Sequence, residues 1–325
     1  MRVLVVIVNY RSAPLTLGAI ASLAPERRSH PDLRVTVIEN DSRDGSLETL
    51  QQAVATPSFS DWVRVVGMPS NGGFAHGVNA GVGPGLAEPN PPDAFLLLNP
   101  DTILRPGALS ALVAFLQTHP RVGIAGSRLE DEDGTQQHSS FRFPGFWSEL
   151  DSGLRLGFVS RLLQQHRIAE PLRDDAHRTG WVAGACALVR REVFERIGLM
   201  DDGFFLYFEE TDFMRRAAAA GYECWYVPAS RVVHLVGRSS GVTTRGWVTP
   251  RRPAYWFESR KRYFRRHHGA LGALACHLAY FLGYTSWRVR NLVERRPSLD
   301  PPCFWRDFAA HHFLPRALRR IVTGT

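Results

Sequence analysis

The sequence predicts an α/β fold: a mostly parallel sheet with helices on both faces, followed by a helical C-terminal extension. Three observations predict it. Short apolar runs rich in β-branched residues alternate with helix-like stretches through the first half of the chain. These runs are apolar at almost every position, which is typical of strands buried on both faces. The surplus of basic residues lies near the C-terminus, where the pattern becomes helical and aromatic.

The expected strands are short, and they span residues 3–8, 35–39, 63–67, 95–98 and 122–125. The helices expected between them span residues 15–23, 47–54, 75–82 and 107–118. Pro106 opens the last of these helices at a first-turn position, and Pro120 follows its end. Further along, we expect a strand over residues 185–189 and helices over 191–197 and 211–220. Each crossover between parallel strands should be right-handed.

The length of 325 residues suits one large domain with an appendage. We expect the domain to cover residues 1–248 and a basic, aromatic helical region to cover residues 249–325. Residues 130–180 are polar and weakly periodic, which predicts a long insertion or lid within the first domain.

The cysteines and the N-terminal sequence indicate the cellular compartment in which the protein works. The four cysteines form no CxxC pair, so the sequence predicts neither a zinc site nor a disulfide framework. The apolar run 3–8 is too short for the core of a signal peptide. We therefore expect a reducing, cytoplasmic setting.

The basic residues are segregated along the chain. Residues 250–325 hold 15 Lys/Arg against 4 Asp/Glu, whereas residues 1–249 hold 24 against 27. Residues 255–266 interleave aromatic and basic side chains, which suits a nucleic acid or an anionic membrane, but no nucleic-acid-binding signature accompanies them. The apolar run 271–287 would measure about 25 Å as a helix, short of a ~30 Å hydrocarbon core. This favours a helix lying in the membrane plane; the alternative is an amphipathic helix packed on the first domain.

The ends of the expected strands carry polar residues instead of a glycine-rich nucleotide loop. After the first strand the chain reads Asn9-Tyr10-Arg11-Ser12, so neither GxGxxG nor GxxxxGK[ST] is present there. Ligands of open α/β sheets bind at the carboxyl ends of the strands. The polar residues at these ends are Asn9, Glu39, Asn40, Asn71, Asn99 and Asp101. The sequence therefore predicts one binding crevice lined by these side chains.

Six segments occur in a fixed order: VIVNYRS, VIENDSRDGS, NGGFAHGVNAG, LLLNPDT, GWVAGACALVRREVFERIGLMDDGFFLYFEETDFMRRAAAAGY and VVHLVGRSSG. As an ordered series over residues 1 to about 245, they resemble glycosyltransferase family 2, and in particular its bacterial rhamnosyltransferase-like branch. The resemblance implies the GT-A fold, which is Rossmann-like. It also implies a role in cell-wall or polysaccharide biosynthesis.

The resemblance implies a reaction as well. A sugar, with rhamnose favoured, would pass with inversion from a dTDP- or UDP-linked donor to a hydroxyl of a lipid-linked or polysaccharide acceptor. The enzyme would lie peripherally on the inner face of the cell membrane. One alternative is a sugar-1-phosphate nucleotidyltransferase, but the glycine-rich loop with Arg and Lys that this class carries after strand one is absent. The other is a non-catalytic family member that serves as a scaffold or binding protein.

Donor binding is expected at the first three strand ends. A carboxylate after strand two can accept the N3–H of uracil or thymine, and Glu39 stands where the family commonly has Asp; capping of the turn is the alternative. Asn9 would help to hold the base or ribose, with a role in the turn alone as the alternative, and Asn40 is a further expected donor contact. In NGGFAHGVNAG the helix N-terminus would face an anion, while close packing through Gly77 and Gly81 is a compatible role. The donor contacts that the resemblance implies here are Asn71, Gly73, Phe74 and Asn79.

The segment LLLNPDT is the counterpart of the family's metal-binding DxD element. Asp101 would bind Mg²⁺ or Mn²⁺, which prefer oxygen ligands and bridge phosphate oxygens. Asn99, a further donor contact, replaces the first Asp and removes one negative charge. His234 lies where family members often supply a metal-binding or diphosphate-binding histidine, although a histidine at a strand end is often only structural. We therefore expect a metal site with few protein ligands.

The catalytic base is expected at the start of the helix after FFLYF. By the register of the family, Glu210 matches the base position, and Asp212 matches a nearby acidic position that orients the base or the acceptor. Carboxylates are also favoured at a helix start by the helix dipole, and Asp212 could pair with Arg215 or Arg216 at helical spacing. The acceptor contacts that we expect nearby are Trp181, Gly184 and Glu209.

Overall fold

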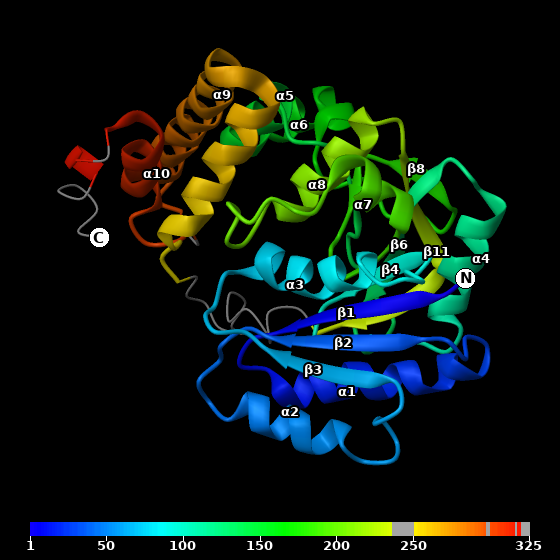
Figure 1. The fold of residues 1–325 in the computed structure, drawn as a ribbon. Helices are drawn as coiled ribbons and strands as arrows, with labels where there is room; N and C mark the ends of the chain where they lie inside the picture. The colour runs from blue at the N-terminus through cyan, green and yellow to red at the C-terminus, as the bar shows by residue number, and fades with distance from the viewer. Residues whose placement is uncertain (236–249, 297–299, 316, 320–325) are drawn as a thin grey trace. The chain divides into compact units, whose positions relative to one another are not determined.

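The computed structural model describes residues 1–235, 250–296, 300–315 and 317–319 (Figure 1). The chain divides into two compact units. The sheet unit comprises Met1–Phe141, Ala169–Phe205 and the described residues of Glu209–Ser240. The helical unit comprises Arg142–Ile168, Leu206–Phe208 and the described residues of Gly241–Thr325. The segment 130–180 is thus shared between the units, and residues 142–168 group with the C-terminal helices.

The main element of the sheet unit is a mixed sheet, which has nine strands among the described residues. Eight of them follow the order β3-β2-β1-β4-β10-β6-β11-β5, and β8 pairs with β11. Their bounds are β1 Val3–Asn9, β2 Arg34–Glu39, β3 Val63–Gly67, β4 Ala94–Leu98, β5 Thr102–Leu104, β6 Val122–Glu130, β8 His177–Thr179, β10 Cys186–Arg190 and β11 Glu223–His234. The strands β1 to β4 are mutually parallel, so their carboxyl ends meet at one edge. This confirms the predicted α/β fold.

Both faces of the sheet are covered. Val3, Val5 and Ile7 of β1 point into the main apolar core, to which the helices α1 (Ala13–Leu23), α2 (Ser46–Val54) and α4 (Ala108–Thr118) also contribute. The alternate residues of β1 face α3 (Phe74–Leu86), which lies on the other side (Figure 1). The α7 helix (Arg191–Ile197) joins that side through the contacts Phe95–Phe194 and Phe194–Phe213. Phe213 lies on α8 (Glu209–Ala219).

Several elements differ from the sequence-based expectation. β10 runs antiparallel to both β4 and β6, and β11 continues over 12 residues, of which the apolar pattern marked only the end. The strands β5 and β8 and the separate pair β7 (Ser140–Phe141) and β9 (Trp181–Val182) were not predicted. Each has only two or three residues, which is too few for a periodic pattern to show.

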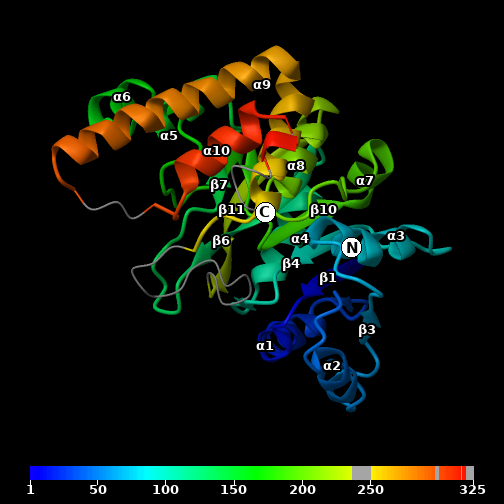
Figure 2. The same cartoon turned by 90° about the vertical axis from the view of Figure 1, so that its left-hand side faces the viewer.

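The helical unit contains α5 (Phe146–Leu154), α6 (Gly157–Leu162), α9 (Ala254–Val293) and α10 (Phe304–Phe313). The α9 helix is interrupted at Gly269, whose φ of 68° is left-handed. Its second half packs closely on α5, because a side chain at Gly153 would meet the carbonyl oxygen of Tyr280. Figures 1 and 2 both show α5 and α6 alongside α9. None of the described helices has an apolar stretch long enough to cross a bilayer.

The aromatic residues of segment 255–266 point inward within this unit. Phe257, Tyr263 and Phe264 are fully buried, and Phe257 lies 5.9 Å from Phe304 of α10, measured between ring centroids. Arg260 is also buried and donates to Glu149, to Nδ1 of His277 at 2.5 Å and to Nε2 of His312 at 3.3 Å. The interleaving of aromatic and basic residues therefore builds a core with a charged centre.

Candidate active site

The ends of β1 and β2 bring Asn9 and Glu39 together. Asn9 is fully buried, and its Oδ1 accepts hydrogen bonds from the hydroxyls of Ser12 at 3.1 Å and Thr16 at 2.8 Å. Its Nδ2 donates to Oε1 of Glu39 at 3.5 Å. The same carboxylate oxygen accepts from the backbone N–H of Ser42 at 3.0 Å and from its hydroxyl. Glu39 therefore caps the turn, and both side chains are fixed before any ligand binds.

Asn40 lies beside this pair and carries a buried acceptor. Its Nδ2 donates to Oδ1 of Asn71 at 3.0 Å and to the carbonyl oxygen of Gly73 at 3.1 Å. Its Oδ1 is buried and has no hydrogen-bond partner among the described residues. An unsatisfied buried amide oxygen costs about 1–3 kcal/mol, so this atom is suited to accept a hydrogen bond from a ligand.

The start of α3 is shaped by Gly73. Its φ is +88°, and a Cβ there would overlap the carbonyl oxygen of Phe205, which accepts the N–H of Phe74 at 2.8 Å. Only glycine fits both conditions. Oδ1 of Asn71 caps the N–H of Gly73 at 2.9 Å. Asn79 donates to the Met200 carbonyl at 2.8 Å and accepts its N–H at 3.0 Å, so its amide anchors the segment around residue 200.

The end of β4 places Asp101 next to His234. Asp101 is 2% exposed, and its Oδ1 lies 3.6 Å from Nε2 of His234 at the end of β11. β5 pairs antiparallel with β11 and aligns Thr102 with His234. Burial lowers the pKa of His234, although the charge of Asp101 opposes this shift. A neutral imidazole and a carboxylate that face each other form a pair of ligands suited to a divalent cation.

Asn99 is engaged through its backbone. Its N–H donates to the Ala185 carbonyl at 2.9 Å, and its own carbonyl accepts the hydroxyl of Thr102 at 2.6 Å. These bonds fix the turn that carries Asp101 and join it to the segment before β10. No group of three His, Cys, Asp or Glu side chains suited to a metal occurs in the described parts of the chain.

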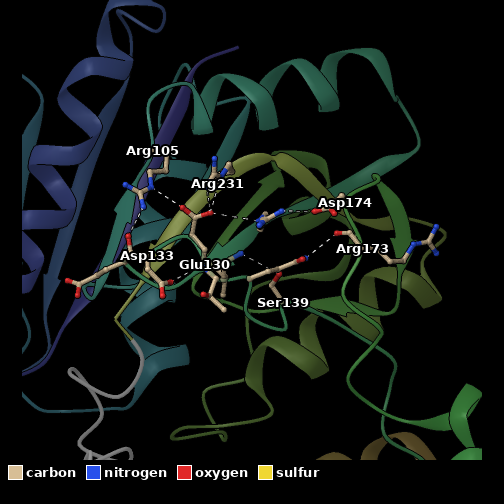
Figure 3. A network of polar contacts seen from close by, with 12 residues as sticks. Arg105, Glu130, Asp133, Ser139, Arg173, Asp174 and Arg231 are labelled. Carbon is tan, nitrogen blue, oxygen red and sulfur yellow. Dashed lines mark hydrogen bonds and ion pairs between the residues drawn. The ribbon is translucent and has the colours of Figure 1, made fainter.

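A polar network that the sequence did not predict holds the strands behind this pair. The carboxylate of Glu130, fully buried at the end of β6, accepts from Nε of Arg105 at 2.9 Å and Nε of Arg231 at 2.9 Å (Figure 3). Arg128 approaches it at 3.8 Å and reaches Asp174 at 2.7 Å. Burial raises the pKa of Glu130, but the two bonded guanidinium groups outweigh it and hold the pKa below its usual value.

The network ties β5, β6 and β11 into one rigid support. Arg231 lies three residues before His234 and Arg105 four residues after Asp101, so its members flank both candidate ligands in sequence. The apolar run 122–125 stops at Gly126, and no pattern marks residue 130 as part of a strand.

The start of α8 contains two adjacent buried carboxyl groups, those of Glu209 and Glu210. They share a hydrogen bond, and the carboxylate of Glu210 also accepts the N–H of Gly184. Burial raises the pKa of both groups, and the negative charge of Glu210 raises that of Glu209 further. The pKa of Glu209 is raised the more strongly, so Glu210 is the group of the pair that ionises more readily. The Oε2 atoms of both have no partner among the described residues.

The backbone leading into α8 is strained. Tyr207 and Phe208 have φ values of 71° and 68°, a left-handed region that costs non-glycine residues of order 1–3 kcal/mol each. Such conformations cluster at functional sites.

Asp212, in the first turn of α8, has a structural partner. It is fully buried and pairs with Nε of Arg216 at 2.9 Å. Arg216 also donates to the carbonyls of Ile197 at 2.8 Å and Leu199 at 2.9 Å. Asp212 thus anchors α8 to the end of α7, which is the alternative that its spacing allowed.

Trp181 stacks on Phe141 with ring centroids 4.3 Å apart, on the small β7–β9 pair. Its indole is partly exposed, as an aromatic platform for a sugar ring would be. Phe141 was not predicted as a site residue, because nothing in its local sequence places it against Trp181.

Sequence comparison places this arrangement in a family. The family described as Glycosyltransferase like family 2 matches residues 1–269. The chain is 29% identical over 250 residues to the N-acetylglucosaminyl-diphospho-decaprenol L-rhamnosyltransferase of Mycobacterium tuberculosis, which covers 73% of this chain and 77% of that protein. It is 27% identical over 164 residues to rhamnosyltransferase WbbL of Escherichia coli, with 50% and 60% covered.

Solved structures share the fold. The mannosyltransferase PcManGT from Pyrobaculum calidifontis, in complex with GDP-Man and Mn²⁺, has a TM-score of 0.58 at 17% identity and covers 91% of this chain and 76% of that one. GalNAc-T7 with UDP, GalNAc and Mn²⁺ has a TM-score of 0.57 at 16% identity, with 100% and 56% covered. The sheet is thus GT-A-like. Given this fold and a family match over residues 1–269, the chain belongs to glycosyltransferase family 2.

Proposed function

We propose that this glycosyltransferase moves rhamnose, with inversion, from a dTDP- or UDP-linked donor to a hydroxyl of a lipid-linked glycan. The observation that carries the proposal is the pair of buried sites in one unit: the ligand pair Asp101–His234 and the carboxyl pair Glu209–Glu210. The N–H of Asn99 donates to the carbonyl of Ala185, and the N–H of the adjacent Gly184 donates to the carboxylate of Glu210. Short backbone links therefore join the two sites. The relatives' names favour sugar transfer over the nucleotidyltransferase and scaffold alternatives.

The nucleotide would bind at the ends of β1 and β2. Glu39 presents a carboxylate held by Ser42 and Asn9, and the buried Oδ1 of Asn40 offers a further acceptor. Together they suit a ligand with ring or hydroxyl donors, such as uracil, thymine or ribose. The N-terminus of α3, with Gly73 and Phe74, would face the diphosphate.

Asp101 and His234 would hold Mn²⁺ or Mg²⁺. An oxygen and a nitrogen ligand 3.6 Å apart fit one cation, whose other ligands would come from the diphosphate and water. When bound, the cation neutralises the charge that develops on the departing diphosphate. The lowered pKa of His234 keeps the imidazole neutral and able to bind a metal at pH 7. Two solved structures of this fold contain Mn²⁺.

Glu210 would act as the base. As the acceptor hydroxyl attacks the anomeric carbon, Glu210 takes its proton, and the bond to the diphosphate breaks on the opposite face, which inverts the configuration. Its raised pKa brings it closer to that of an efficient base at neutral pH. Because the pKa of Glu209 is raised further than that of Glu210, Glu210 is the partner that ionises more readily, while Asp212 holds α8 in place.

The acceptor would rest on Trp181 and near Gly184. A relative acts on N-acetylglucosaminyl-diphospho-decaprenol, according to its name, so a polyprenyl-linked glycan is the acceptor we propose. Such an acceptor would place the enzyme peripherally on the inner face of the cell membrane.

Donor turnover tests this proposal. The full chain is incubated with dTDP-rhamnose and with UDP-sugars, together with membrane lipid extract and Mn²⁺ or Mg²⁺, and release of the nucleotide diphosphate is measured. We expect one donor to be consumed only when lipid extract and metal are present. Asp101→Asn should lower turnover at least a hundredfold, whereas the matched surface variant Asp133→Asn should leave it unchanged. No consumption of any donor, or equal turnover by Asp101→Asn, would refute the proposal.

A further inference from the structure

The second half of α9 presents an apolar stripe to solvent. Between residues 271 and 285, all of which are described, the exposed positions are Leu271, Leu274, Leu278 and Leu282. The stripe continues with Val289, Leu292 and Val293, and four of its members are more than 60% exposed: Leu271 at 84%, Leu282 at 62%, Leu292 at 79% and Val293 at 77%. At 3.6 residues per turn the seven side chains lie within an arc of about 100°, over about 33 Å of helix.

The opposite face of the same helix is fully used. Cys276, His277, Gly283 and Tyr284 are buried, and a Cβ at Gly283 would lie 2.8 Å from the backbone nitrogen of Leu154 on α5. The leucines are therefore not a core face left over by loose packing. When one apolar face of a helix is buried in the protein and a second apolar face contacts water, the second face forms a patch that normally marks an interaction site.

Charge identifies the partner. Arg265 and Arg266 precede the stripe, and Arg288, Arg295 and Arg296 are exposed at its far end. The sequence from residue 250 to 325 holds 15 Lys/Arg against 4 Asp/Glu. An apolar stripe bordered by arginines is the pattern of a helix that lies in the headgroup region of an anionic bilayer. It cannot span the bilayer, because no described helix is apolar enough.

A second apolar patch lies in the same unit. Phe158 at 70% and Leu162 at 77% exposure are four residues apart on α6, so they share one side of that short helix. The aromatic segment 255–266, whose composition suited a nucleic acid or an anionic membrane, has Phe257, Tyr263 and Phe264 buried.

We propose that the enzyme docks on anionic lipid through the leucine stripe of α9, defined as Leu271, Leu274, Leu278, Leu282, Val289, Leu292 and Val293. The docking is reversible and in the plane of the surface. The role of this docking rests on the proposed function: it would concentrate the enzyme on the surface that contains a lipid-linked acceptor. Binding itself requires neither donor nor acceptor, so the two proposals fail separately.

Vesicle binding of the full chain tests the docking. Large vesicles of phosphatidylcholine with 30% phosphatidylglycerol, and of phosphatidylcholine alone, are sedimented with wild type and with Leu278→Asp/Leu282→Asp. We expect binding of wild type to the anionic vesicles, and a loss of at least tenfold in affinity in the double variant. The control is Val66→Asp/Leu172→Asp, which makes the same change in charge and exposed apolar residues in the sheet unit and should bind as wild type does.

A direct measurement covers the case in which the variant is misfolded. Nitroxide labels are placed singly at residues 278 and 282, and at Ser286 as a position beside the stripe, in a Cys303→Ser background that removes the exposed thiol. With anionic vesicles, labels 278 and 282 should gain accessibility to oxygen and lose it to a water-soluble relaxant at least threefold. The proposal would be overturned by unchanged label accessibility or by equal vesicle binding of wild type and Leu278→Asp/Leu282→Asp. It would also be overturned if wild type were a dimer that this double variant converts to monomer, because the stripe would then bind a second copy of the chain.

Discussion

The packing of α3 on β1 makes a quantitative prediction at Gly81. A Cβ built at this position lies 2.5 Å from Cγ1 and 3.1 Å from Cγ2 of Val6. Val6 is 1% exposed and sits in β1 between β2 and β4, so it cannot move aside. Overpacking of this kind costs roughly 1–3 kcal/mol, and the immobile strand places Gly81→Ala near the upper end. Alanine recovers about 1 kcal/mol of helix propensity, which leaves a net loss of about 2 kcal/mol.

Gly18 offers a matched control. It lies in the middle of α1, and a Cβ there would meet only Cδ1 of Ile103, at an ordinary 3.4 Å. Gly18→Ala should therefore stabilise the protein by about 1 kcal/mol through helix propensity alone. The same substitution is thus expected to have opposite signs in two helices of the sheet unit.

Thermal unfolding followed by circular dichroism measures both. At roughly 2–4 °C per kcal/mol, Gly81→Ala should lower Tm by about 4–8 °C and Gly18→Ala should raise it by about 2–4 °C. Because Gly73, in the proposed donor site, caps the start of α3, Gly81→Ala should also raise the KM for the donor. A Tm for Gly81→Ala equal to or above that of Gly18→Ala would refute the close packing.

Four further predictions concern single side chains. Glu149→Ala should lower the free energy of unfolding of the helical unit by about 3–5 kcal/mol in urea, because it removes the carboxylate that pairs with the buried Arg260. A decrease below 1 kcal/mol would contradict the buried ion pair. Burial, with Arg260 nearby, lowers the pKa of His277 to about 2, so unfolding takes up a proton below pH 6.5. As the pH falls below 6.5, this group should lower the free energy of unfolding by up to about 1.4 kcal/mol per pH unit. His277→Asn should remove this contribution to the slope in pH-dependent Tm measurements. Asn40→Ala should raise the donor KM about tenfold with little change in kcat, since Oδ1 of Asn40 would bind donor in ground and transition states alike; an unchanged KM would remove it from the site. Trp181→Ala should raise the acceptor KM while Trp181→Phe retains most binding in the same assay, and equal effects of both would argue against stacking.

The sheet could be predicted because its longer strands have a recognisable pattern in the local sequence. Val3 to Val8 are apolar at every position, and a run of this kind is typical of a strand buried on both faces. The observed β1 is buried at all seven positions. The antiparallel course of β10 was not predictable, because the residues of a buried strand look the same in either direction. β5 and β8 are too short to carry a period.

Site residues were predictable in type and only partly in role. Asp101 and His234 lie 133 residues apart in the sequence, and the structure brings them to 3.6 Å. Asn79 could equally have been a ligand contact or an anchor, and only its two bonds to Met200 show the anchoring role. Glu130 had no signal, because a lone carboxylate after a broken apolar run looks like a surface residue.

The C-terminal helix shows the same limit. The leucines at 271, 274, 278 and 282 are visible in the sequence, but which face of α9 packs on α5 depends on Gly153 and Gly283. Composition predicts that a helix is amphipathic; tertiary packing decides which of its apolar faces stays in contact with solvent.

The most direct test of sugar transfer at this site is the steady-state comparison of Glu210→Gln with wild type, with donor affinity measured separately by calorimetry. The substitution keeps the shape of the side chain and removes the base. We predict that kcat falls by about 10²–10⁴ while the donor Kd changes less than threefold. A kcat within twofold of wild type, in a variant that still binds donor, would contradict the assignment of Glu210 as the base that accepts the acceptor's proton.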